Sequence, residues 1–527
     1  MIGNLVNKHI ENWFFIAALL FAVVLPFSHA MVSILAGVLL FTAIWEDSWK
    51  NKLARLNKNR VLFFIPGIFL IYLISSVLTV KPGEPWYDLQ KTLFYLVIPL
   101  AFIIGKPFTD YQQRKLLFAF SFSVMLSIFT SLVRWLVLPD SAGFSMHEIS
   151  LVSHIRFSFQ LILGFWFLIF FFQLNCNNLL PKYRIVVLLS AVVFLLFLFF
   201  QQSLTGLIAF GASLLLYSVY HVFQLKLIKR YAFLIFVLLV IAVPVVYLVR
   251  TINNFYNIEK VSEEALDKTT IRGNPYLHDL DNPMVENGHY VFIYLCEDEM
   301  RNEWNNLSTL KYDSLAGNGY PVSASLIRYL TSKGLRKDAD GVLALSEKDR
   351  RNIEMGMANV IFSRKEYSLY PRIYQTIWEY YMFSKTGDPN YQSFSQRIVF
   401  SHAAIEIIKE NFWFGVGAGN WKEAFNQVFT KEYLSLKEDL YASSHNQYLN
   451  YMVKFGILGF LAIMFFIVYP VVISRKYVDH LFILFLVSLF FANFADSNFE
   501  AHMGSSFFLF FYSFFMKSGK TTYLKLS

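Results

Sequence analysis

The sequence SSHNQYLNYMVKFGILGF, residues 443–460, places a histidine where a long polar segment meets an apolar run of membrane length. A neutral imidazole suits a general base, because histidine changes charge near neutral pH. If a helix starts near Ser444, Gly456 and Gly459 lie within about 40° of the helix face that carries His445. Glycines on one face let a neighbouring helix approach closely. We therefore expect the His445 ring at the outer mouth of a tightly packed helix pair.

The same residues also have a purely structural interpretation. The polar run from Ser443 to Asn446 has the residue types that cap the first turn of a helix, and a cap requires no chemistry of His445. By the same helical arithmetic Lys454 lies on roughly the opposite face, so we do not expect it to be the partner of His445. The choice between base and cap depends on the rest of the chain.

The elements that position these residues follow from composition. Hydrophobic residues make up 56% of the chain and charged residues 16%, whereas soluble domains carry about 25% charged residues. The excess apolar surface predicts an all-α polytopic membrane protein with about twelve transmembrane helices. Eleven or thirteen spans stay open, because several runs are shorter than the ~20 residues of a straight span. The apolar runs are 13–29, 30–45, 61–80, 92–105, 115–138, 156–175, 185–201, 205–222, 232–249, 447–473, 481–495 and 504–516.

Basic residues predict the orientation of these spans. They cluster after every even-numbered run, at 50–60, 106–115, 182–184, 226–230, 475–476 and 517–525. Positive charge marks cytoplasmic loops, so both termini are expected in the cytoplasm and residues 250–446 outside. The net charge of +9 is then a topology signal and gives no indication of nucleic acid. We do not expect the first run to be a cleaved signal peptide, because a second run follows it directly.

The long outer segment is predicted to be mainly helical. Helix-like spacing covers 289–304 and 322–332, and 394–410 is typical of one helix. Ser346 is a predicted N-cap within 345–360, and Pro371 is predicted in the first turn of an aromatic-rich helix over 368–384. We expect the aromatic stripe of that helix to be core rather than a sugar-stacking platform. Cys176 and Cys296 fall on opposite sides of the membrane, so no disulfide is expected.

The domain organisation follows from these assignments. Residues 1–249 are predicted to form an N-terminal bundle of about nine transmembrane helices. Residues 250–446 form a periplasmic domain that carries part of the active site, and residues 447–527 add about three transmembrane helices.

The full pattern around the boundary histidine resembles a known signature. It reads His-Asn, nine residues, Gly, two residues, Gly. This resembles the motif of the O-antigen ligase superfamily, which also includes O-antigen polymerases and some protein O-oligosaccharyltransferases. FWFGVGAGNW at 412–421 is similar to the Gly-x-Gly-x-Gly stretch that precedes this histidine in the family. The stretches 288–305 and 326–342 look like the loop of ligase-family proteins of Bacteroidetes type. The resemblance extends over about 150–510.

The resemblance implies a GT-C-type fold and a glycan donor carried on undecaprenyl diphosphate, with no cofactor. Displacing a diphosphate from an anomeric carbon requires cations for the leaving charge and a base for the attacking hydroxyl. No pair of aspartates at metal-binding spacing stands at the outer surface, so metal-independent catalysis is preferred. Arginines are then expected to bind the diphosphate, since a planar guanidinium matches phosphate oxygens and stays charged.

Three arginines match this role by position. Arg397 lies in the helix predicted over 394–410, where the family has an arginine in a comparable loop helix. Arg156, in SHIRFSFQ, enters the sixth span at the outer surface and matches a family arginine near that span. Arg134 ends the fifth span. An arginine beside an apolar span can instead be a snorkelling anchor, an alternative that we favour for Arg134 alone.

One position departs from the family pattern. Many relatives carry Ser-Arg-x-Gly at the start of a central span, and the arginine there grips phosphate. Here QQSLTGLIAF has Leu204 in the arginine position. Another cation, Arg250 or Arg272, is expected to supply that charge, or else the donor is held differently.

The last outer turn completes the expected site. ADSNFEAHMGSSFF, residues 495–508, is similar to the acidic, glycine-containing turn of relatives. Glu500 is expected to orient His445 or to hydrogen-bond a sugar, although capping and solubility explain it equally well. Asn446 is expected to fix the imidazole ring.

These observations predict a glycosyltransferase of the bacterial inner membrane whose active site faces the periplasm. It would transfer a glycan from undecaprenyl diphosphate to a hydroxyl of lipid A–core or of another glycan, in contact with membrane lipids. O-antigen polymerase is the first alternative and protein O-oligosaccharyltransferase the second. A transporter or flippase is disfavoured, because few charges interrupt the spans and no repeat is evident.

Overall fold

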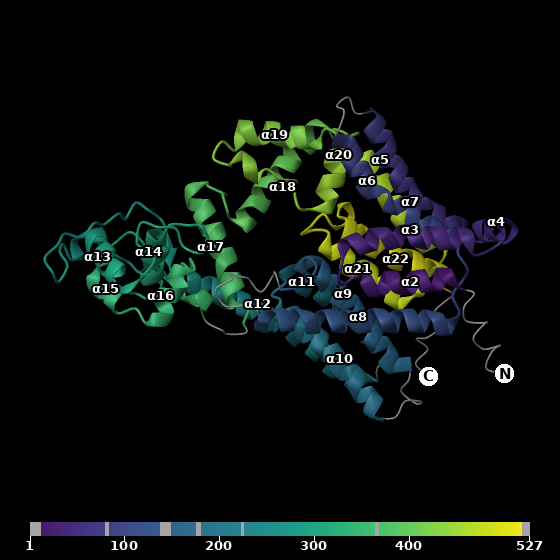
Figure 1. Ribbon diagram of the computed structural model, residues 1–527, viewed down its shortest axis with the longest axis horizontal. Helices are drawn as coiled ribbons and strands as arrows, with labels where there is room; N and C mark the ends of the chain where they lie inside the picture. Colours follow the sequence, from purple (N-terminus) through teal and green to yellow (C-terminus); the bar gives the residue numbers. More distant parts are fainter. Residues whose placement is uncertain are drawn as a thin grey trace. The chain divides into compact units, whose positions relative to one another are not determined.

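The computed structural model describes residues 12–78, 84–137, 149–174, 181–222, 226–363 and 368–518. Within these ranges the elements are helical apart from one two-stranded antiparallel sheet, in which β1 (Val285–Glu286) pairs with β2 (His289–Tyr290) (Figure 1). The chain divides into two compact units. Unit 1 comprises Met1–Val137, Met146–Phe233 and Arg397–Ser527, and unit 2 comprises Leu138–Ser145 and Leu234–Gln396. The division into 1–249, 250–446 and 447–527 concerns membrane sides rather than compactness, and it stays a prediction.

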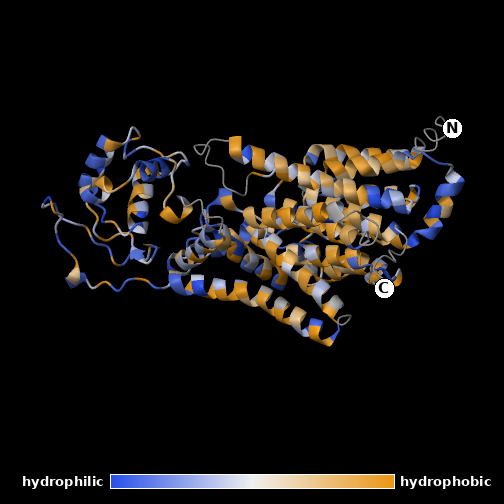
Figure 2. Cartoon of the chain, turned by 90° about the horizontal axis from the view of Figure 1, so that it is seen from below, coloured by the Kyte–Doolittle hydropathy of each residue, from blue (hydrophilic) through white to orange (hydrophobic). Residues whose placement is uncertain are grey.

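Every predicted apolar run contains a helix. Figure 2 shows that the long helices are predominantly hydrophobic, while hydrophilic residues gather in shorter helices and loops. The helices that correspond to the twelve runs are α2 (Trp13–Val24), α3 (His29–Trp45), α5 (Pro66–Leu78), α7 (Phe94–Ile104), α8 (Asp110–Val137), α9 (His154–Leu174), α10 (Pro181–Phe200), α11 (Leu204–Val222), α12 (Leu227–Phe255), α20 (Gln447–Ile473), α21 (His480–Ala492) and α22 (His502–Lys517).

The protein is therefore an all-α, multi-pass membrane protein. Six of the described helices are long and apolar enough to cross a membrane, and the bent pair α3 and α4 (Trp49–Lys58) would make a seventh. The remaining apolar helices are shorter than a straight span requires. The number of twelve spans and the GT-C fold stay predictions.

The interior of unit 1 is built around α22. Every residue from Met503 to Phe515 is buried, which is the pattern of a helix surrounded by other helices. The Phe510 ring stacks on Phe21 of α2 with centroids 4.6 Å apart and meets Phe102 of α7 edge-on at 5.4 Å. Close-packed phenylalanine rings thus hold helices from both ends of the chain together.

Basic residues satisfy the carbonyl groups at the C-terminal end of α7. Arg55 Nε donates to the Ile104 carbonyl at 2.7 Å, and Lys517 Nζ donates to the Phe102 carbonyl at 2.6 Å. Helix C-termini leave four carbonyls without helical partners and carry partial negative charge. The charges that predicted the cytoplasmic face are therefore also caps for this helix end.

Unit 2 contains several of the predicted elements. Helix α14 (Val322–Ser332) coincides with the predicted range, and Ser346 forms a capping box with Asp349 at the start of α16 (Glu347–Glu354). Helix α17 (Tyr370–Thr386) carries Pro371 at its start, and α18 (Ser393–Glu410) continues from unit 2 into unit 1. The other helices of the unit are α13 (Glu297–Leu307) and α15 (Ala339–Leu343).

The helix predicted over 289–304 is wrong in its first half, which holds the second strand of a hairpin and the turns that follow it. Asn287 and Gly288 join β1 to β2 with positive φ angles of 51° and 88°. An Asn-Gly turn with both φ angles positive matches the twist of two antiparallel strands. Helix α13 begins only at Glu297. The Asn-Gly pair was the sequence signal that would have indicated the hairpin.

Candidate active site

The glycine motif on α20 forms a break in the helix rather than a helix–helix contact. Gly456 has φ 61° and ψ −170°, so it leaves the helical conformation. The helix-face arithmetic that placed both glycines on the face of His445 is therefore wrong. A side chain at Gly456 would clash with the backbone of Trp413 and Phe414, and Gly459 lies one turn beyond the break, next to Phe455.

The segment 412–417 fills this break with its own backbone. The N–H groups of Val416 and Gly417 donate to the carbonyls of Val453 and Lys454 at 2.8 and 2.9 Å, and Ile457 N–H donates to the Phe412 carbonyl at 2.8 Å. Broken helices persist at membrane depth only when the freed backbone groups find partners. The Gly-x-Gly stretch and the α20 glycines are thus two halves of one packing arrangement.

His445 sits in a rigid turn just before α20. Its φ of 50° is left-handed, a conformation that non-glycine residues adopt only when their surroundings hold them there. Ser444 Oγ donates to Asn450 Oδ1 at 2.7 Å, and Asn450 Nδ2 donates to Ser497 Oγ at 2.6 Å. The turn before α20 is thereby tied to the turn that follows α21.

Gln447 makes a second connection between these turns. Its backbone N–H donates to the Asn493 carbonyl at 2.9 Å, and its side-chain oxygen accepts from Phe499 N–H at 2.8 Å. The position of His445 relative to residues 493–499 is therefore fixed on both sides.

Asp496 is the group that His445 and Arg156 share. His445 Nδ1 lies 3.9 Å from Asp496 Oδ1, and Arg156 Nη2 lies 4.0 Å from Asp496 Oδ2. Burial by itself would raise the pKa of Asp496, but the His445 ring and the Arg156 charge hold that pKa below its ordinary value. Asp496 is thus an anion at neutral pH and can orient the imidazole.

Arg397 reaches the same turn from α18. Its Nη1 donates to the Ala495 carbonyl at 2.6 Å. The structure therefore brings His445, Arg156 and Arg397 together around residues 495–496, although they are far apart in the chain. The sequence placed Asp496 at the outer end of the last helix pair but did not identify it as the shared partner.

A cavity of about 520 Å³ adjoins Arg156 within unit 1. It is lined by first-turn residues of three helices, namely His29 of α3, Arg156 of α9 and His502 of α22, together with Lys91 at the end of α6 (Glu84–Thr92) and Glu500. Helix N-termini carry partial positive charge and point N–H groups outward, so this lining attracts anions.

Two buried nitrogen atoms of this lining have no hydrogen-bond partner among the residues that the structure describes. They are Arg156 Nε and His502 Nδ1. A buried donor without a partner is costly and is commonly satisfied by water or a ligand. An anion with several oxygens could accept a hydrogen bond from each of these nitrogen atoms.

Glu500 pairs with Lys454 rather than with His445, which corrects the expectation that Glu500 orients the imidazole. Lys454 is only 3% exposed, and its Nζ lies 2.9 Å from Glu500 Oε1 and 3.2 Å from Asp88 Oδ2. Tyr72 donates to Glu500 at 2.8 Å and Trp421 Nε1 donates to Asp88 at 2.8 Å. Lys454 thus lies between two carboxylates, and Lys91, 3.6 Å from Asp88, supplies a second positive charge. A lone lysine inside an apolar run was the signal for such a network.

Asn446 caps α20, and its side chain makes no hydrogen bond with the His445 ring. Its side-chain oxygen accepts from Tyr448 N–H at 3.0 Å and from Leu449 N–H at 3.2 Å. The expectation that Asn446 fixes the imidazole is therefore wrong, because the Asn446 side-chain oxygen accepts hydrogen bonds from the first turn of α20.

The remaining candidate arginines are Arg134 of unit 1 and Arg250 and Arg272 of unit 2. Arg134 is in the last turn of α8 and makes no hydrogen bond or ion pair with His445, Asp496 or the other described site residues. Arg272 and Arg250 belong to unit 2, where Arg272 Nη1 pairs with Glu303 at 2.8 Å. Lys91 is the other strong cation at the cavity beside Arg156.

The described ranges contain no group of three or more His, Cys, Asp or Glu side chains arranged to hold a metal ion. Metal independence stays a prediction. The chemistry that these residues offer is proton transfer at His445 and charge compensation by guanidinium and ammonium groups.

Residues 350–464 match the family model described as O-antigen ligase. The matched range contains Arg397, the 412–417 segment, His445 and both α20 glycines. No curated protein matches the chain.

Proposed function

The chain carries a domain of the O-antigen ligase superfamily, and from this premise we propose that it transfers a glycan from undecaprenyl diphosphate to a hydroxyl of lipid A–core. The reaction takes place at the periplasmic face of the bacterial inner membrane. The family implies a glycosyltransferase-like ligase activity with a lipid-linked glycan and a lipid acceptor as substrates. The identities of donor and acceptor belong to this proposal.

The observation that carries the proposal is the arrangement around Asp496. An imidazole, a carboxylate and two guanidinium groups meet at one turn, next to a cavity lined by cations and helix N-termini. An imidazole paired with a carboxylate can act as a base, and the adjacent positive charge compensates a phosphate leaving group.

Each residue then has a defined task. His445 Nε2 takes the proton from the acceptor hydroxyl while that oxygen attacks the anomeric carbon. The new bond forms as the bond from the anomeric carbon to the diphosphate oxygen breaks, and its electron pair leaves with the undecaprenyl diphosphate. Asp496 holds the ring through Nδ1, and Arg156, Arg397 and Lys91 compensate the phosphate charge. Lys91 takes the place of the arginine that Leu204 replaces.

The direct test measures transfer by purified protein with a defined glycan on undecaprenyl diphosphate and candidate acceptors, read by product mass. His445→Ala should lower the rate by about 10²–10⁴-fold, the usual contribution of a general base. The matched control is His402→Ala, because His402 is an exposed histidine on α18. Near-normal transfer by His445→Ala would remove this residue from the mechanism.

A deletion strain separates the ligase from its nearest relatives. Loss of all lipopolysaccharide-linked polymer on an immunoblot supports the ligase. Caps of a single repeat unit would instead indicate an O-antigen polymerase, and missing glycoproteins would indicate a protein O-oligosaccharyltransferase.

A further inference from the structure

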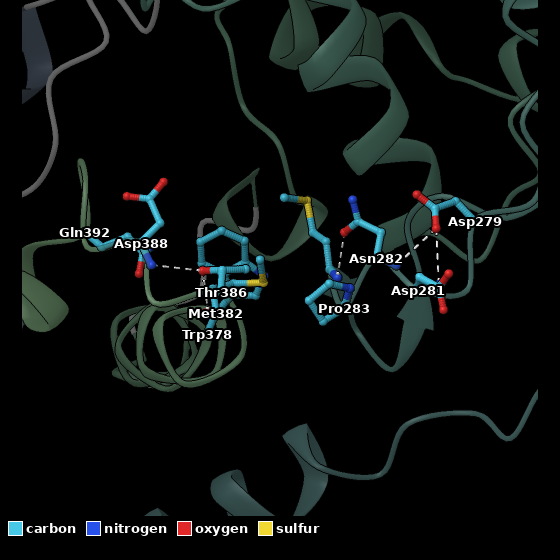
Figure 3. A pocket seen from close by; sticks show the side chains of 10 residues that line it. Asp279, Asp281, Asn282, Pro283, Trp378, Met382, Thr386, Asp388 and Gln392 are labelled. Carbon is cyan, nitrogen blue, oxygen red and sulfur yellow. Dashed lines mark hydrogen bonds between the residues drawn. The ribbon is translucent and has the colours of Figure 1, made fainter. Parts of the chain in front are cut away.

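A second cavity, of about 540 Å³, lies entirely within unit 2. One wall is the loop 279–284 that leads into β1, and the other is formed by the second half of α17 and the residues that follow it. Figure 3 shows the two groups of side chains on either side of the opening, with Asp281 and Asn282 in one group and Met382 and Asp388 in the other.

Hydrogen bonds fix the two walls to each other. Trp378 Nε1 donates to the Val285 carbonyl at 2.9 Å, and the Tyr381 hydroxyl donates to the Pro283 carbonyl at 3.0 Å. Asp279 Oδ1 closes the loop by accepting from the N–H groups of Asp281 and Asn282 at 3.1 and 3.2 Å. The cavity is therefore preformed, which lowers the entropy cost of binding.

The inner part of the cavity is apolar. It is lined by Trp378, Met382 and Met284. The Arg328 guanidinium lies over the Trp378 ring, 4.5 Å from its centroid, and holds the indole in place. An aromatic ring with a negative face attracts the C–H groups of a sugar ring, and thioethers adapt to irregular apolar surfaces.

The rim of the cavity carries carboxylate and amide groups whose hydrogen-bonding capacity is only partly used by the described residues. The Asp281 carboxylate makes no hydrogen bond or ion pair with any described residue, and Asp388 uses only Oδ1, which accepts from Asn390. Asn282 uses its oxygen to accept from Met284 N–H, so its NH₂ group is available within the described part of the chain. Carboxylates accept and amides donate, and together they match the hydroxyls of a sugar.

The charge of the lining selects against anions. Asp279, Asp281 and Asp388 line the cavity, and no Lys, Arg or His does. A phosphate or a uronic acid would be repelled here, because like charges at short range are unfavourable. The three carboxylates also do not gather as metal ligands within the described residues.

We propose that this cavity binds an uncharged oligosaccharide. The apolar floor takes the face of one sugar ring, and the carboxylates and amides of the rim take its hydroxyls. That this oligosaccharide is the glycan being transferred rests on the proposed function. The site would then hold the glycan by its sugars.

The test measures binding of neutral hexose and N-acetylhexosamine oligosaccharides to the full-length protein by saturation-transfer NMR and titration. The protein is held in lipid nanodiscs prepared without sugar-based detergent, because a maltoside head group would compete for such a site. The variant is Asp281→Ala combined with Asp388→Ala, and the control is Glu264→Ala, an exposed carboxylate of the same unit. Thermal unfolding checks that both variants fold.

We expect at least one neutral oligosaccharide to bind and the double variant to weaken its binding at least tenfold, with the control unchanged. Trp378→Leu should lower the affinity further. No binding by any neutral oligosaccharide, equal binding by the folded double variant, tighter binding of a uronic acid oligosaccharide, or saturable calcium binding in place of sugar would each overturn the proposal.

Transfer measurements separate this inference from the proposed function. Glycan binding that depends on Asp281 and Asp388, in a protein without transfer activity, would refute only the transferase proposal. Normal transfer by the wild type without any glycan binding would refute only the glycan site. If both hold, the double variant should raise KM for the glycan donor several-fold and leave kcat close to the wild-type value.

Discussion

The two cavities of this protein have opposite linings. The unit 1 cavity presents Arg156, Lys91 and the first turns of three helices, whereas the unit 2 cavity presents three aspartates above an indole. Each unit also contains an ion pair with a buried member. Lys454 pairs with Glu500 in unit 1, and Arg328 pairs with Glu286 at 2.5 Å in unit 2.

The difference suits a chain that binds the two parts of a glycolipid, its diphosphate and its glycan, in two different cavities. A diphosphate carries concentrated negative charge and requires fixed cations. An uncharged glycan presents hydroxyls and C–H faces, which require acceptors and an aromatic surface. The comparison predicts that substitutions in one cavity change one property of substrate binding and leave the other unaltered.

The largest expected effect comes from Lys454→Met. The substitution leaves the half-buried Glu500 without its cation and leaves Asp88 only Lys91, 3.6 Å away; removing one partner of a buried ion pair typically costs about 3–5 kcal/mol. The free energy of unfolding in mixed micelles should fall accordingly. Adding Glu500→Gln should restore part of the loss. Lys409→Met, which removes an exposed lysine on α18, is the control, and an equally small effect in both variants would contradict the network.

The next largest effect is expected from Arg156→Ala. This substitution should weaken the interaction with the diphosphate and leave binding of the sugars unchanged. Losing a charge-assisted hydrogen bond costs about 1.5–3 kcal/mol, so kcat/KM for the lipid-linked donor should fall by about 10–10²-fold. Binding of the free neutral oligosaccharide should not change. Arg156→Lys should recover part of the activity, since it keeps the charge but not the planar fork. If both variants lost glycan binding to the same degree as Arg156→Ala lost transfer, the separation of the two cavities would fail.

Lys337→Met in unit 2 should stabilise the protein at neutral pH. Burial lowers the pKa of Lys337 to about 8, below the ordinary value of about 10.4. The unfolded chain therefore binds more protons between these two values, and the cost of burying the ammonium group is greatest below pH 8. The gain in unfolding free energy should be largest at pH 7 and should disappear as pH rises towards 10.4. A gain that persists at pH 11 would point to packing instead.

The smallest expected effect concerns Asp349, which forms the capping box of α16 with the N-cap Ser346. Burial would raise its pKa, but hydrogen bonds from Lys333, Ser346 and Tyr329 lower it to about 2, against an ordinary value of about 3.9. Its contribution to stability is present above pH 4 and is lost as pH falls towards 2. Asp349→Ala should cost about 1 kcal/mol at pH 7, the usual size of a capping contribution, and clearly less at pH 2, where about half of the Asp349 carboxyls in the folded state are protonated. Unfolding curves at both pH values check this sign.

Local sequence determined a large part of the fold. Each of the twelve apolar runs is a helix, and the ends of α14, α16 and α17 follow caps and turn residues that are readable without a structure. These features depend on neighbours within a few residues, so periodicity and capping rules suffice. The hairpin at Asn287–Gly288 was also readable, and the helical spacing of the residues after it concealed the turn.

The sequence predicted part of the candidate site, and the tertiary structure determined the rest. The alternation of basic loops predicted that the starts of even-numbered runs lie at one face, and the structure does gather the first turns of α3, α9 and α22 around one cavity. The family motif drew attention to His445, Arg156 and Arg397, which meet at residues 495–496.

Only the tertiary structure determined which polar side chains pair with one another. Tyr72 and Glu500 are 428 residues apart in the chain, and Lys454 and Asp88 are 366 apart. The break at Gly456 likewise exists because segment 412–417 supplies its missing backbone partners. Hydrophobic patterning tells a helix which face to bury, but it carries no information about which distant polar group will lie opposite. That information arises only when the helices pack.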